Sequence, residues 1–525
     1  MNGSHIAAQS GQYPAFTIFS IGVVCALLMA LWCSPERDTT NEFFVSNRRV
    51  SAGQNGLALF GDYISAAALL GVPGLIALNG YDGLLYVLGP IVALPLILVL
   101  IAEPFHASGR FTMADSMARR LRPRPMHKAL GISTLAASML YLIAQLVGAG
   151  ALAAPMLGIS GPTAQRLLAA SLGFLMIIYV VIGGMKAATL MQCIKAVVLL
   201  AASSCLAVLV LSKFSFGLDD LLAASARMHS AGEEFLRPGH RFGDGMIGSL
   251  NMFSLQLGLV LGAAGLPHLL MRLCAVPTAR KARTSVEGAT VLTFLFCLTA
   301  AVLGFGAIAV LGGDAITPPG NTATLLLAES LGGSLLLAVI CCVVFATILA
   351  VVAGVMLTAA TSVAHDLYSA VIKSGRTSDE KELFVARASV VVIGVIAICL
   401  SMLAQNINPS VLIGLSFAVA ASAHLPTILF TFYWRDFTTT GATWSVYGGL
   451  ISSVGLTILS PAVSGSPSAM VPGMDFSYFP LQNPGVVSIP LSFLLGWLGS
   501  RFGRERPDRV RYAAFEARTL TDTKS

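Results

Sequence analysis

Asp62 is the residue of this chain whose type and position most directly suggest chemistry. It is the only acid in the otherwise apolar segment 57–78, which reads LALFGDYISAAALLGVPGLIAL. A charge at the centre of a membrane helix costs about 2.5–3.5 kcal/mol on insertion scales. Gly71, Pro73 and Gly74 also interrupt the segment, and a broken helix leaves backbone groups in the membrane without partners. If the break forms part of an ion-binding site, both the charge of Asp62 and the backbone groups without partners can bind the ion.

A second apolar segment, residues 256–272, is interrupted in the same way. It reads QLGLVLGAAGLPHLLMR, with Gly262, Gly265 and Pro267 near its centre. If an extra N-terminal helix is set aside, the two breaks fall in core helices 1 and 6, which are matching positions of two five-helix halves. Such paired interruptions indicate an inverted-repeat transporter with a site near the bilayer midplane. The alternative is that the glycines serve close helix packing and the acid pairs locally.

The composition is that of a polytopic membrane protein. Of the 525 residues, 56% are hydrophobic and 11% are charged, whereas soluble domains carry about 25% charged residues. The net charge of +7 does not imply a nucleic-acid partner, because the placement of positive charge matters more than its sum in a membrane protein. The nine cysteines suggest no disulfide framework and no CxxC metal spacing.

The distribution of lysine and arginine predicts the topology. A transmembrane helix needs about 20 mainly apolar residues. Thirteen such segments occur, at 16–33, 55–78, 82–103, 130–156, 164–182, 188–211, 249–271, 289–311, 335–364, 386–405, 409–432, 442–460 and 485–502. With the N-terminus outside, the inner segments hold 26 of the 32 lysines and arginines and the outer segments hold five. The positive-inside rule therefore predicts an outer N-terminus and a cytoplasmic C-terminus in a bacterial plasma membrane. The first span is not a secretory signal, because its arginines follow it.

These spans divide the chain into four parts. Residues 1–54 comprise the outer N-terminus, the extra first helix and an inner loop. Residues 55–432 form the predicted inverted-repeat transport core, and residues 433–503 carry two peripheral helices. Residues 504–525 form a basic cytoplasmic tail, expected to be solvated and within reach of anionic lipid. No soluble domain is expected, and no oligomer is required.

Six stretches, spread over about residues 43–460, resemble the sodium:solute symporter family, and most closely its cation/acetate branch. They are GLALFGDYISAAALLGVPGLIALNGYDGLLYVLG, YLIAQLVGAG, IGGMKAATLMQCIKAVVLL, LGAAGLPHLLMR, ILAVVAGVMLTAATSVAHDLY and FAVAASAHLPTILFTFYWRDFTTTGA. The most specific signals are GLPHLLMR followed by basic residues and the pattern FxxYWRxFTTTGA. The resemblance implies an all-α integral membrane fold with thirteen transmembrane helices. It would have a LeuT-type five-plus-five inverted-repeat core, one extra N-terminal helix and two extra C-terminal helices.

The resemblance also implies a cation site between core helices 1 and 8. The implied ion-binding residues are Gly61, Asp62, Ile64, Thr347, Ala350 and Val351. Gly61 and Ile64 would contribute backbone carbonyls, and so would Thr347. Relatives usually have hydroxyl groups at the positions of Ala350 and Val351, which this chain lacks.

A second departure from the family pattern lies in core helix 5. Many sodium-coupled relatives have an aspartate where this chain has Gln192, and Lys195 follows three residues later. The missing hydroxyls leave Thr347, Thr358 and Thr361 as nearby alternatives. Sodium and the proton therefore both remain candidates for the coupling cation, since a buried carboxylate can carry a proton. Lys195 is expected to snorkel or to pair with an acid.

The expected substrate contacts come from the two breaks and two further helices. Tyr141 and Gln145 lie four residues apart and hence on one face of core helix 3. By resemblance, Tyr141 matches an aromatic residue implicated in substrate binding by proline symporters. His424 lies inside a span and titrates near neutral pH, so it is a candidate gate, proton relay or carboxylate contact, or else a hydrogen-bonded core histidine. The candidate substrate-binding residues are Tyr63, Ser65, Tyr141, Gln145, Gly262, Ala263, Gly265 and His424.

The sequence predicts a symporter that takes up a small monocarboxylate such as acetate, propionate or pyruvate with sodium or a proton. No P-loop, zinc motif or nucleophile elbow is present, so no enzyme activity, ATP dependence or cofactor is expected. The alternatives are a symporter for another small solute such as an amino acid, and a transporter-like solute sensor. A sensor would be favoured by a long signalling domain after the last span, and only a short tail follows it here.

Overall fold

The structure is a computed structural model in which the described residues form helices joined by loops. It describes residues 39–521, apart from 157–161, 240, 244, 317–319, 405–408, 466–468, 470 and 472, together with scattered residues between 21 and 32. Within these residues, Ser464 and Val471 form an isolated β-bridge. The predicted first span therefore lies largely outside the described residues, and the all-helical character is confirmed for the rest.

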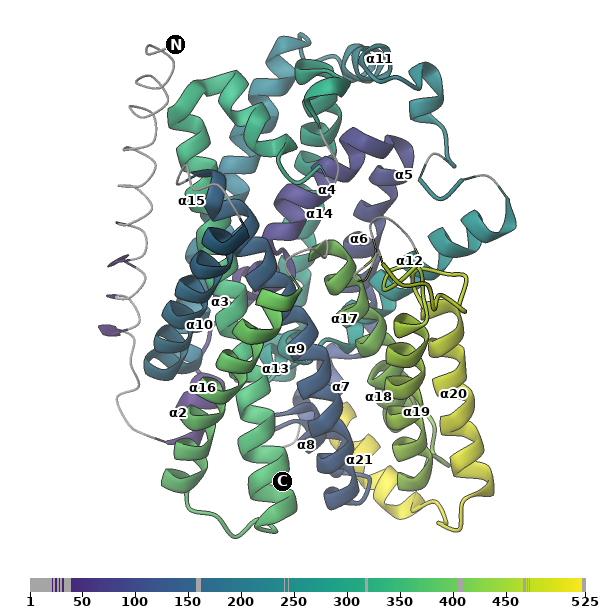
Figure 1. The fold of residues 1–525 in the computed structure, drawn as a ribbon. Coiled ribbons are helices and arrows are strands. Elements are labelled where there is room, and N and C mark those ends of the chain that lie inside the picture. The colour runs from purple at the N-terminus through teal and green to yellow at the C-terminus, as the bar shows by residue number, and fades with distance from the viewer. Residues whose placement is uncertain are drawn as a thin grey trace.

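The helices of the first half include two long ones and several short ones at the ends of the bundle. They are α2 (Thr40–Val45), η1 (Ser46–Arg48), α3 (Ala52–Tyr63), α4 (Ala66–Asn79), α5 (Tyr81–Leu84), η2 (Leu85–Val87), α6 (Leu88–Leu100), α7 (Ala102–Ser108), α8 (Met113–Ala118), α9 (Pro123–Met156), α10 (Pro162–Lys213), α11 (Leu218–Met228) and η3 (Gly232–Leu236). In Figure 1, α11 marks one end of the molecule and α8 the opposite end.

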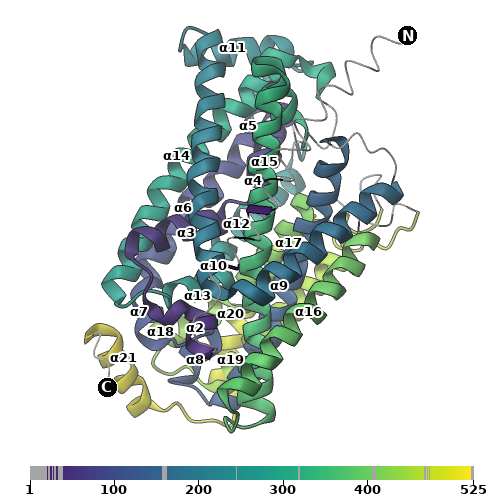
Figure 2. The same cartoon turned by 90° about the vertical axis from the view of Figure 1, so that its left-hand side faces the viewer.

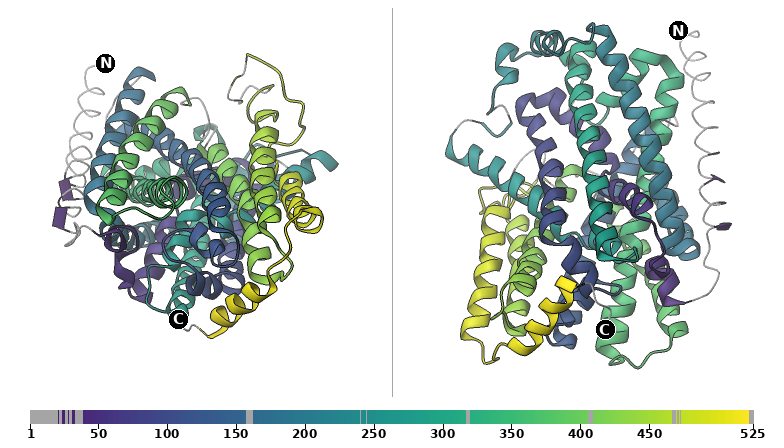
Figure 3. Two further views of the ribbon diagram at one scale, coloured as in Figure 1. Left: turned by 90° about the horizontal axis from the view of Figure 1, so that it is seen from below. Right: turned by 180° about the vertical axis from the view of Figure 1, so that it is seen from behind.

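The second half begins with a broken helix, as the first half does. Its helices are α12 (Met246–Gly265), α13 (Pro267–Leu273), α14 (Ala279–Leu311), η4 (Gly313–Ala315), α15 (Ala323–Thr361), the π-helix η5 (Ser362–Ile372), α16 (Asp379–Leu403), α17 (Pro409–Ala423), α18 (Leu425–Tyr433), α19 (Thr439–Ile458), α20 (Gly485–Phe502) and α21 (Arg509–Thr521). Figure 2 shows α10, α14 and α15 running along much of the length of the bundle. α19 and α20 pack together beside α17, as Figure 1 and the right-hand view of Figure 3 show.

The predicted break in the first core span is confirmed, and it lies at Ile64 and Ser65. These two residues have extended backbone angles, with φ/ψ of −83°/105° and −92°/173°. α3 and α4 are bent by 53° across them. Pro73 lies inside α4, so the proline does not cause the break. The break begins two residues after Asp62.

The second predicted break is also confirmed. Leu266 separates α12 from α13 with φ/ψ of −69°/119°, and Pro267 begins α13, where a missing N–H costs nothing. The span predicted at 409–432 consists of α17 and α18, which continue into each other because His424 keeps a helical backbone, with φ/ψ of −102°/−50°.

The number of spans in the described residues is lower than the predicted thirteen. Nine helices there are long and apolar enough to cross a membrane, or ten if α3 and α4 form one span. The first predicted span lies largely outside the described residues, and α19 is not among the nine. The predicted spans 164–182 and 188–211 both fall in α10, which would be about 78 Å long at about 1.5 Å per residue. Gly184 interrupts α10 with φ 55° and ψ −155°, a conformation that suits glycine, so two membrane crossings remain compatible with it.

The C-terminal segment is partly folded rather than fully solvated as expected. Phe515 of α21 is buried and stacks on Phe432 of α18, with ring centroids 5.8 Å apart. Tyr512 of α21 lies under the guanidinium of Arg120, 4.4 Å from ring centroid to Cζ. Nε of Arg518 donates to the carbonyl of Ala107 in α7 at 3.1 Å. Figure 3 shows α21 lying along the α8 end of the bundle, so this helix connects α7 with α18.

A buried polar cluster lies near the same end, between α8, α9, η5 and α16. His365 of η5 contacts two carboxylates, with Nδ1 2.7 Å from Oε1 of Glu382 and Nε2 3.0 Å from Oδ1 of Asp115. Nδ1 of His127 lies 2.8 Å from Oδ1 of Asp366. The backbone N–H groups of residues 111 and 112 donate to the other oxygen of Asp115. The cluster therefore joins four elements through charged and polar groups.

Candidate functional site

Asp62 is fully engaged by neighbouring side chains at the end of α3. It is 1% exposed, and Nε of Arg272 on α13 donates to its Oδ2. Nε2 of Gln192 on α10 donates to its Oδ1, and also to the carbonyl of Ala350 on α15 at 2.8 Å. Nη1 of Arg272 donates to Oγ1 of Thr189 on α10 at 2.6 Å. The carboxylate thus connects α3 with α10 and α13, and Gln192 extends the link to α15. This arrangement matches the alternative that the acid is paired within the protein.

The close approach of α3 and α15 depends on Gly354. A Cβ atom added at this glycine would lie 2.7 Å from Oδ1 of Asp62, which is closer than Cβ contacts normally come. Any side chain here would displace the carboxylate from its partners. The glycine therefore permits the buried ion pair to form against the surface of α15.

The ammonium group of Lys195 lies at the two carbonyls that the family resemblance assigns to a cation. Lys195 is 2% exposed. Its Nζ donates to the carbonyl of Gly61 and, at 2.7 Å, to the carbonyl of Ile64. Because helix α3 ends here, these carbonyls are not used by the continuing helix. The side chain is thus directed into the bundle, and it does not snorkel.

The positions of core helix 8 offer few oxygen atoms to a cation. Oγ1 of Thr347 donates to the carbonyl of Val343 at 2.6 Å within α15, and Oγ1 of Thr358 donates to the carbonyl of Gly354 at 2.9 Å. Ala350 and Val351 are buried aliphatic residues. Thr361 repeats the pattern of the other threonines, with its hydroxyl on the carbonyl of residue 357. These hydroxyls therefore bond back to their own helix.

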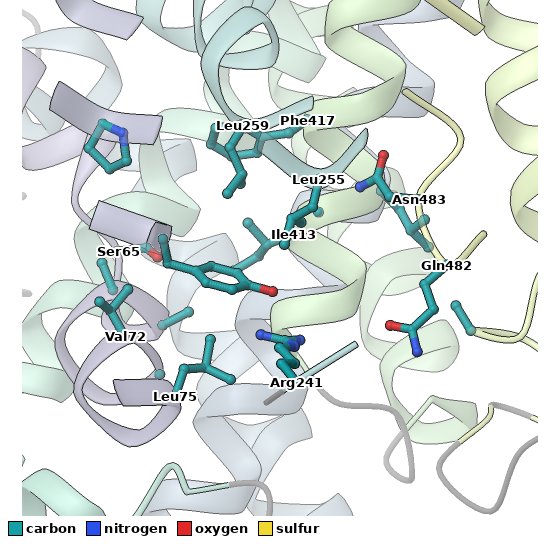
Figure 4. Close-up of a pocket in the computed structure, with 18 of the residues that line it drawn as sticks. Ser65, Val72, Leu75, Arg241, Leu255, Leu259, Ile413, Phe417, Gln482 and Asn483 are labelled. Atoms are coloured by element: carbon teal, nitrogen blue, oxygen red, sulfur yellow. The ribbon is translucent and has the colours of Figure 1, made fainter. Parts of the chain in front are cut away.

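A pocket lies on the α11 side of the first break. Three of the predicted substrate contacts, Tyr63, Ser65 and Tyr141, line it, and so does Ile64. Figure 4 shows Ser65, Val72 and Leu75 of α3–α4 facing Gln482 and Asn483 across the space. Further lining residues shown there are Leu255, Leu259, Ile413 and Phe417. The walls are mostly apolar, and Tyr141 stacks on Phe417 at 6.3 Å between ring centroids.

Arg241 carries the only charge among the described residues that line this pocket. Its guanidinium projects into the space in Figure 4 and lies over the ring of Tyr86, 4.7 Å from Cζ to the centroid. The backbone N–H groups of Arg241 and Gly239 donate to the carboxylate of Asp82, which holds the loop against α5. Nη1 of Arg241 is buried and has no hydrogen-bond partner among the described residues. An anion in the pocket would supply that partner.

The other predicted substrate contacts do not line this pocket. Gln145 is buried on α9, and the glycines of α12 pack against the backbone of α17, Gly262 at Phe417 and Gly265 at Ala420. Ala263 is buried.

His424 is buried as well, at the junction of α17 and α18. Its Nδ1 lies 2.8 Å from the carbonyl of Gly265 on α12, and its Nε2 lies 2.9 Å from Oγ of Ser133 on α9. These contacts match the alternative of a hydrogen-bonded core histidine.

Sequence reasoning did not find Arg241, Gln482 and Asn483 as pocket residues. Each lies in a polar loop far in sequence from the helices that it faces, and Arg241 counted only as an outer positive charge. Arg272 was not among the predicted ion-binding or substrate-binding residues, and it pairs with Asp62. The only feature of the sequence that suggests this pair is that one interrupted segment contains an acid and the other ends in an arginine.

Broken membrane-spanning helices around a buried ion pair, with a pocket beside the break, define a membrane transport protein. Among the described residues, no group of three or more His, Cys, Asp or Glu side chains is arranged to hold a metal ion. The chain belongs to the sodium:solute symporter family, whose family model matches residues 43–449. The resemblance noted in the sequence is thereby confirmed.

Two relatives match almost the whole chain. A monocarboxylic acid transporter of Corynebacterium glutamicum is 46% identical over 520 residues, covering 96% of this chain and 94% of the relative. The uncharacterized symporter YwcA of Bacillus subtilis is 41% identical over 511 residues, covering 97% of this chain and 98% of the relative. Both are transporters by name, so the chain is a transport protein of this family.

Solved structures support the same architecture. A substrate-bound, outward-open Na⁺-coupled sialic acid symporter aligns with a TM-score of 0.71 at 14% identity, covering 94% of this chain and 98% of that one. A nucleobase-cation-symport-1 family transporter in a closed conformation aligns with a TM-score of 0.50 at 12% identity, covering 93% and 98%. At these identities the likeness concerns the fold alone.

Proposed function

We propose that this protein is a symporter that carries a small monocarboxylate across the membrane together with a cation. The observation that carries the proposal is the 46% identity, over 96% of the chain, to a monocarboxylic acid transporter. The pocket supports it, since a mostly apolar space with one buried, unsatisfied guanidinium group suits a short aliphatic acid. A guanidinium group binds a carboxylate through two parallel hydrogen bonds.

The substrate would enter from the α11 end, which the distribution of lysine and arginine assigns to the outside. Arg241 would attract the carboxylate, and Tyr63, Ser65 and Tyr141 would contact the substrate deeper in the pocket. The cation would act at the break between α3 and α4, next to the substrate. Alternating access would follow from a movement of one group of helices against the other around this site. A five-plus-five inverted repeat of the LeuT type fits the two confirmed breaks.

Uptake into proteoliposomes tests the proposal. Purified protein is reconstituted, and uptake of labelled acetate, propionate, pyruvate and proline is compared under imposed sodium and proton gradients. Empty liposomes correct for passage of the undissociated acid. We expect gradient-driven accumulation of at least one monocarboxylate, and unlabelled monocarboxylates should compete for it. Accumulation of proline without any carboxylate would instead establish the amino-acid alternative.

Arg241→Gln tests the assigned carboxylate contact. Loss of a charge-assisted hydrogen bond should weaken binding by about 1.5–3 kcal/mol, which appears as a raised KM with a smaller change in maximal rate. Arg237→Gln is the matched control, because Arg237 is an exposed arginine of the same loop that pairs with Glu234. An unchanged KM in Arg241→Gln would show that Arg241 does not bind the substrate carboxylate.

A further inference from the structure

We propose that a groove near the α8 end of the bundle binds an anionic phospholipid of the membrane. The groove lies between α9, η5, α19 and α20. It shares no lining residue with the substrate pocket. The inference therefore goes beyond the proposed symport and does not depend on which solute is carried.

The positive charge of the groove comes from two side chains of α9. Arg124 and Lys128 are exposed and line the groove, and residues four apart lie about one turn from each other on the same face of a helix. Nη2 of Arg124 donates to Oγ of Ser374. Within the described part of the chain, neither basic residue forms an ion pair, and the residues found to line the groove include no acid. Both groups can therefore contact one phosphate.

The other walls of the groove are apolar. Val371 of η5 and Leu495 of α20 line it. Gly448 of α19 faces Leu495 so closely that any side chain at position 448 would collide with the leucine. The glycine thus lets α19 and α20 meet at the groove, where their surfaces can cover an acyl chain.

Two aromatic residues of α19 also line the groove. Trp444 and Tyr447 are three residues apart on one face of the helix. Trp444 is 48% exposed, on a helix that packs along the apolar span α20. Trp and Tyr rings are enriched where lipid headgroups meet the hydrocarbon. These two rings therefore fit the level of the bilayer at which a headgroup ends and its acyl chains begin.

The position of the groove favours a lipid of the inner leaflet. Arg124 and Lys128 belong to the first turns of α9, at the end that the distribution of lysine and arginine assigns to the cytoplasm. The cytoplasmic leaflet carries anionic lipids, and basic pockets between transmembrane helices on that side bind their headgroups. Figure 1 shows α19 and α20 at one side of the molecule, where lipid can reach them. The charge of the groove thus selects an anionic headgroup over a zwitterionic one.

A lipid in the groove would connect two parts of the chain. The phosphate would be held by α9, which belongs to the predicted transport core, and the acyl chains would lie against the peripheral helices α19 and α20. A ligand that binds only the native state raises its stability. We therefore expect anionic phospholipid to raise the Tm of the detergent-solubilised protein more than phosphatidylcholine does.

Quenching of tryptophan fluorescence by brominated lipid tests the proposal. The chain has four tryptophans, and replacing Trp32, Trp434 and Trp497 by phenylalanine leaves only the one in the groove. The protein is reconstituted into phosphatidylcholine vesicles that contain an increasing share of brominated phosphatidylglycerol or of brominated phosphatidylcholine. Since two basic groups attract the anionic headgroup, half-maximal quenching of Trp444 should need a share of phosphatidylglycerol at least about fivefold lower.

A pair of charge-removing variants identifies the source of this preference. Arg124→Gln together with Lys128→Gln should make the two brominated lipids quench Trp444 equally. The matched control is Arg376→Gln together with Lys381→Gln, which removes two exposed charges where η5 ends and α16 begins, outside the groove. This control should keep the preference. An equal loss of preference in both double variants would show a general attraction to the membrane surface and would overturn the proposal.

A second tryptophan serves as an internal control. Trp497 of α20 is 45% exposed but does not line the groove. A protein that retains this tryptophan alone should be quenched equally by both lipids. The same preference at Trp497 as at Trp444 would contradict a site in the groove.

The remaining outcomes also decide the question. Equal quenching of Trp444 by both lipids without the charge variants would mean that a zwitterionic lipid fills the groove, and absence of quenching would mean that protein covers it. Either result overturns the proposal. If the protein with one tryptophan does not fold, native mass spectrometry of the unmodified chain replaces the measurement. It should then retain phosphatidylglycerol in preference to phosphatidylcholine, and the Arg124 and Lys128 double variant should not.

Discussion

At the scale of residues, the buried pair of Asp62 and Arg272 dominates the site. Both side chains are almost completely buried, with exposures of 1% and 2%. Each of them also has a neutral partner on α10, Gln192 for the carboxylate and Thr189 for the guanidinium group. Charges removed from water need such additional hydrogen bonds to offset the cost of desolvation. The pair therefore acts as one unit with α10.

Replacement of Asp62 should be strongly destabilising. Asp62→Asn leaves the Arg272 guanidinium buried without its counter-charge, and breaking a buried pair in this way typically costs about 3–5 kcal/mol. We expect a clearly lower Tm in detergent and loss of carboxylate uptake. Glu234→Gln removes the acid of an exposed pair with Arg237, and its Tm should stay close to that of the wild type. Wild-type stability and uptake in Asp62→Asn would show that the ion pair is dispensable.

At the scale of elements, the function depends on how closely α3 and α15 approach each other. Gly354 leaves room for the carboxylate of Asp62 on the surface of α15. The same contact brings the end of α3 near α10 and α13, where Gln192 and Arg272 reach it. Interiors are close-packed, so one added methyl group is not absorbed without movement.

A methyl group at Gly354 should therefore damage the site. Gly354→Ala places Cβ 2.7 Å from Oδ1 of Asp62, and overpacking of this kind typically costs about 1–3 kcal/mol. We expect a lower Tm together with reduced uptake. Gly288→Ala on α14 is the control, since a Cβ atom there meets nothing within 4 Å. A Gly354→Ala protein as active and stable as the wild type would show that α15 can shift away from Asp62 at little cost in stability.

The sequence predicted that both core spans are broken, but it was a poor guide to what fills the breaks. Proline located the second break, because Pro267 has no backbone N–H and begins α13. Gly71, Pro73 and Gly74 did not locate the first break, which lies at Ile64 and Ser65. Whether Lys195 meets the carbonyls of α3 depends on how α10 is rotated against α3, and the helical period alone does not define that rotation. The same limit applies to Arg241, which a long loop brings to the pocket.

At the scale of the whole molecule, charged groups near the α8 end hold several elements together. Asp115 of α8 contributes to this through its contact with His365. Burial alone would raise the pKa of Asp115, but the charge and hydrogen bond of His365, the charge of His127 and the N–H of Phe111 outweigh it and hold that pKa below its ordinary value. The stabilisation from this carboxylate is therefore present above the ordinary aspartate pKa and is lost as the pH falls through the lowered value.

The lowered pKa of Asp115 predicts that the effect of Asp115→Asn on stability depends on pH. At neutral pH the variant should unfold at a lower temperature than the wild type, because the ionised partner of His365 is gone. The difference in Tm between the two proteins should shrink as the pH is lowered below the ordinary pKa of aspartate. There Asp115 is protonated in the unfolded wild type, so its ionised form stabilises the folded state less and less. The measurement is Tm against pH for both proteins. A difference that grows toward acid pH would contradict the assignment.

The docking of α21 also belongs to the scale of the whole molecule. Phe515→Ala removes a buried ring from the contact with Phe432, and such a loss costs at most about 3–5 kcal/mol in a full core. We expect α21 to detach locally, seen as faster hydrogen exchange and earlier protease cleavage after residue 502, with little change in global Tm. Val510→Ala is the control, because Val510 is 83% exposed. Equal protease sensitivity of the two variants would show that Phe515 does not anchor the helix.

The position of α21 has a practical consequence. The helix contacts α7 through Arg518 and α18 through Phe515, which come from opposite halves of the chain. Any motion that separates these halves must either carry α21 along or pull it away from one of them. A donor dye on α21 with an acceptor dye on either neighbour would thus report the transport cycle in single molecules, without any radioactive solute.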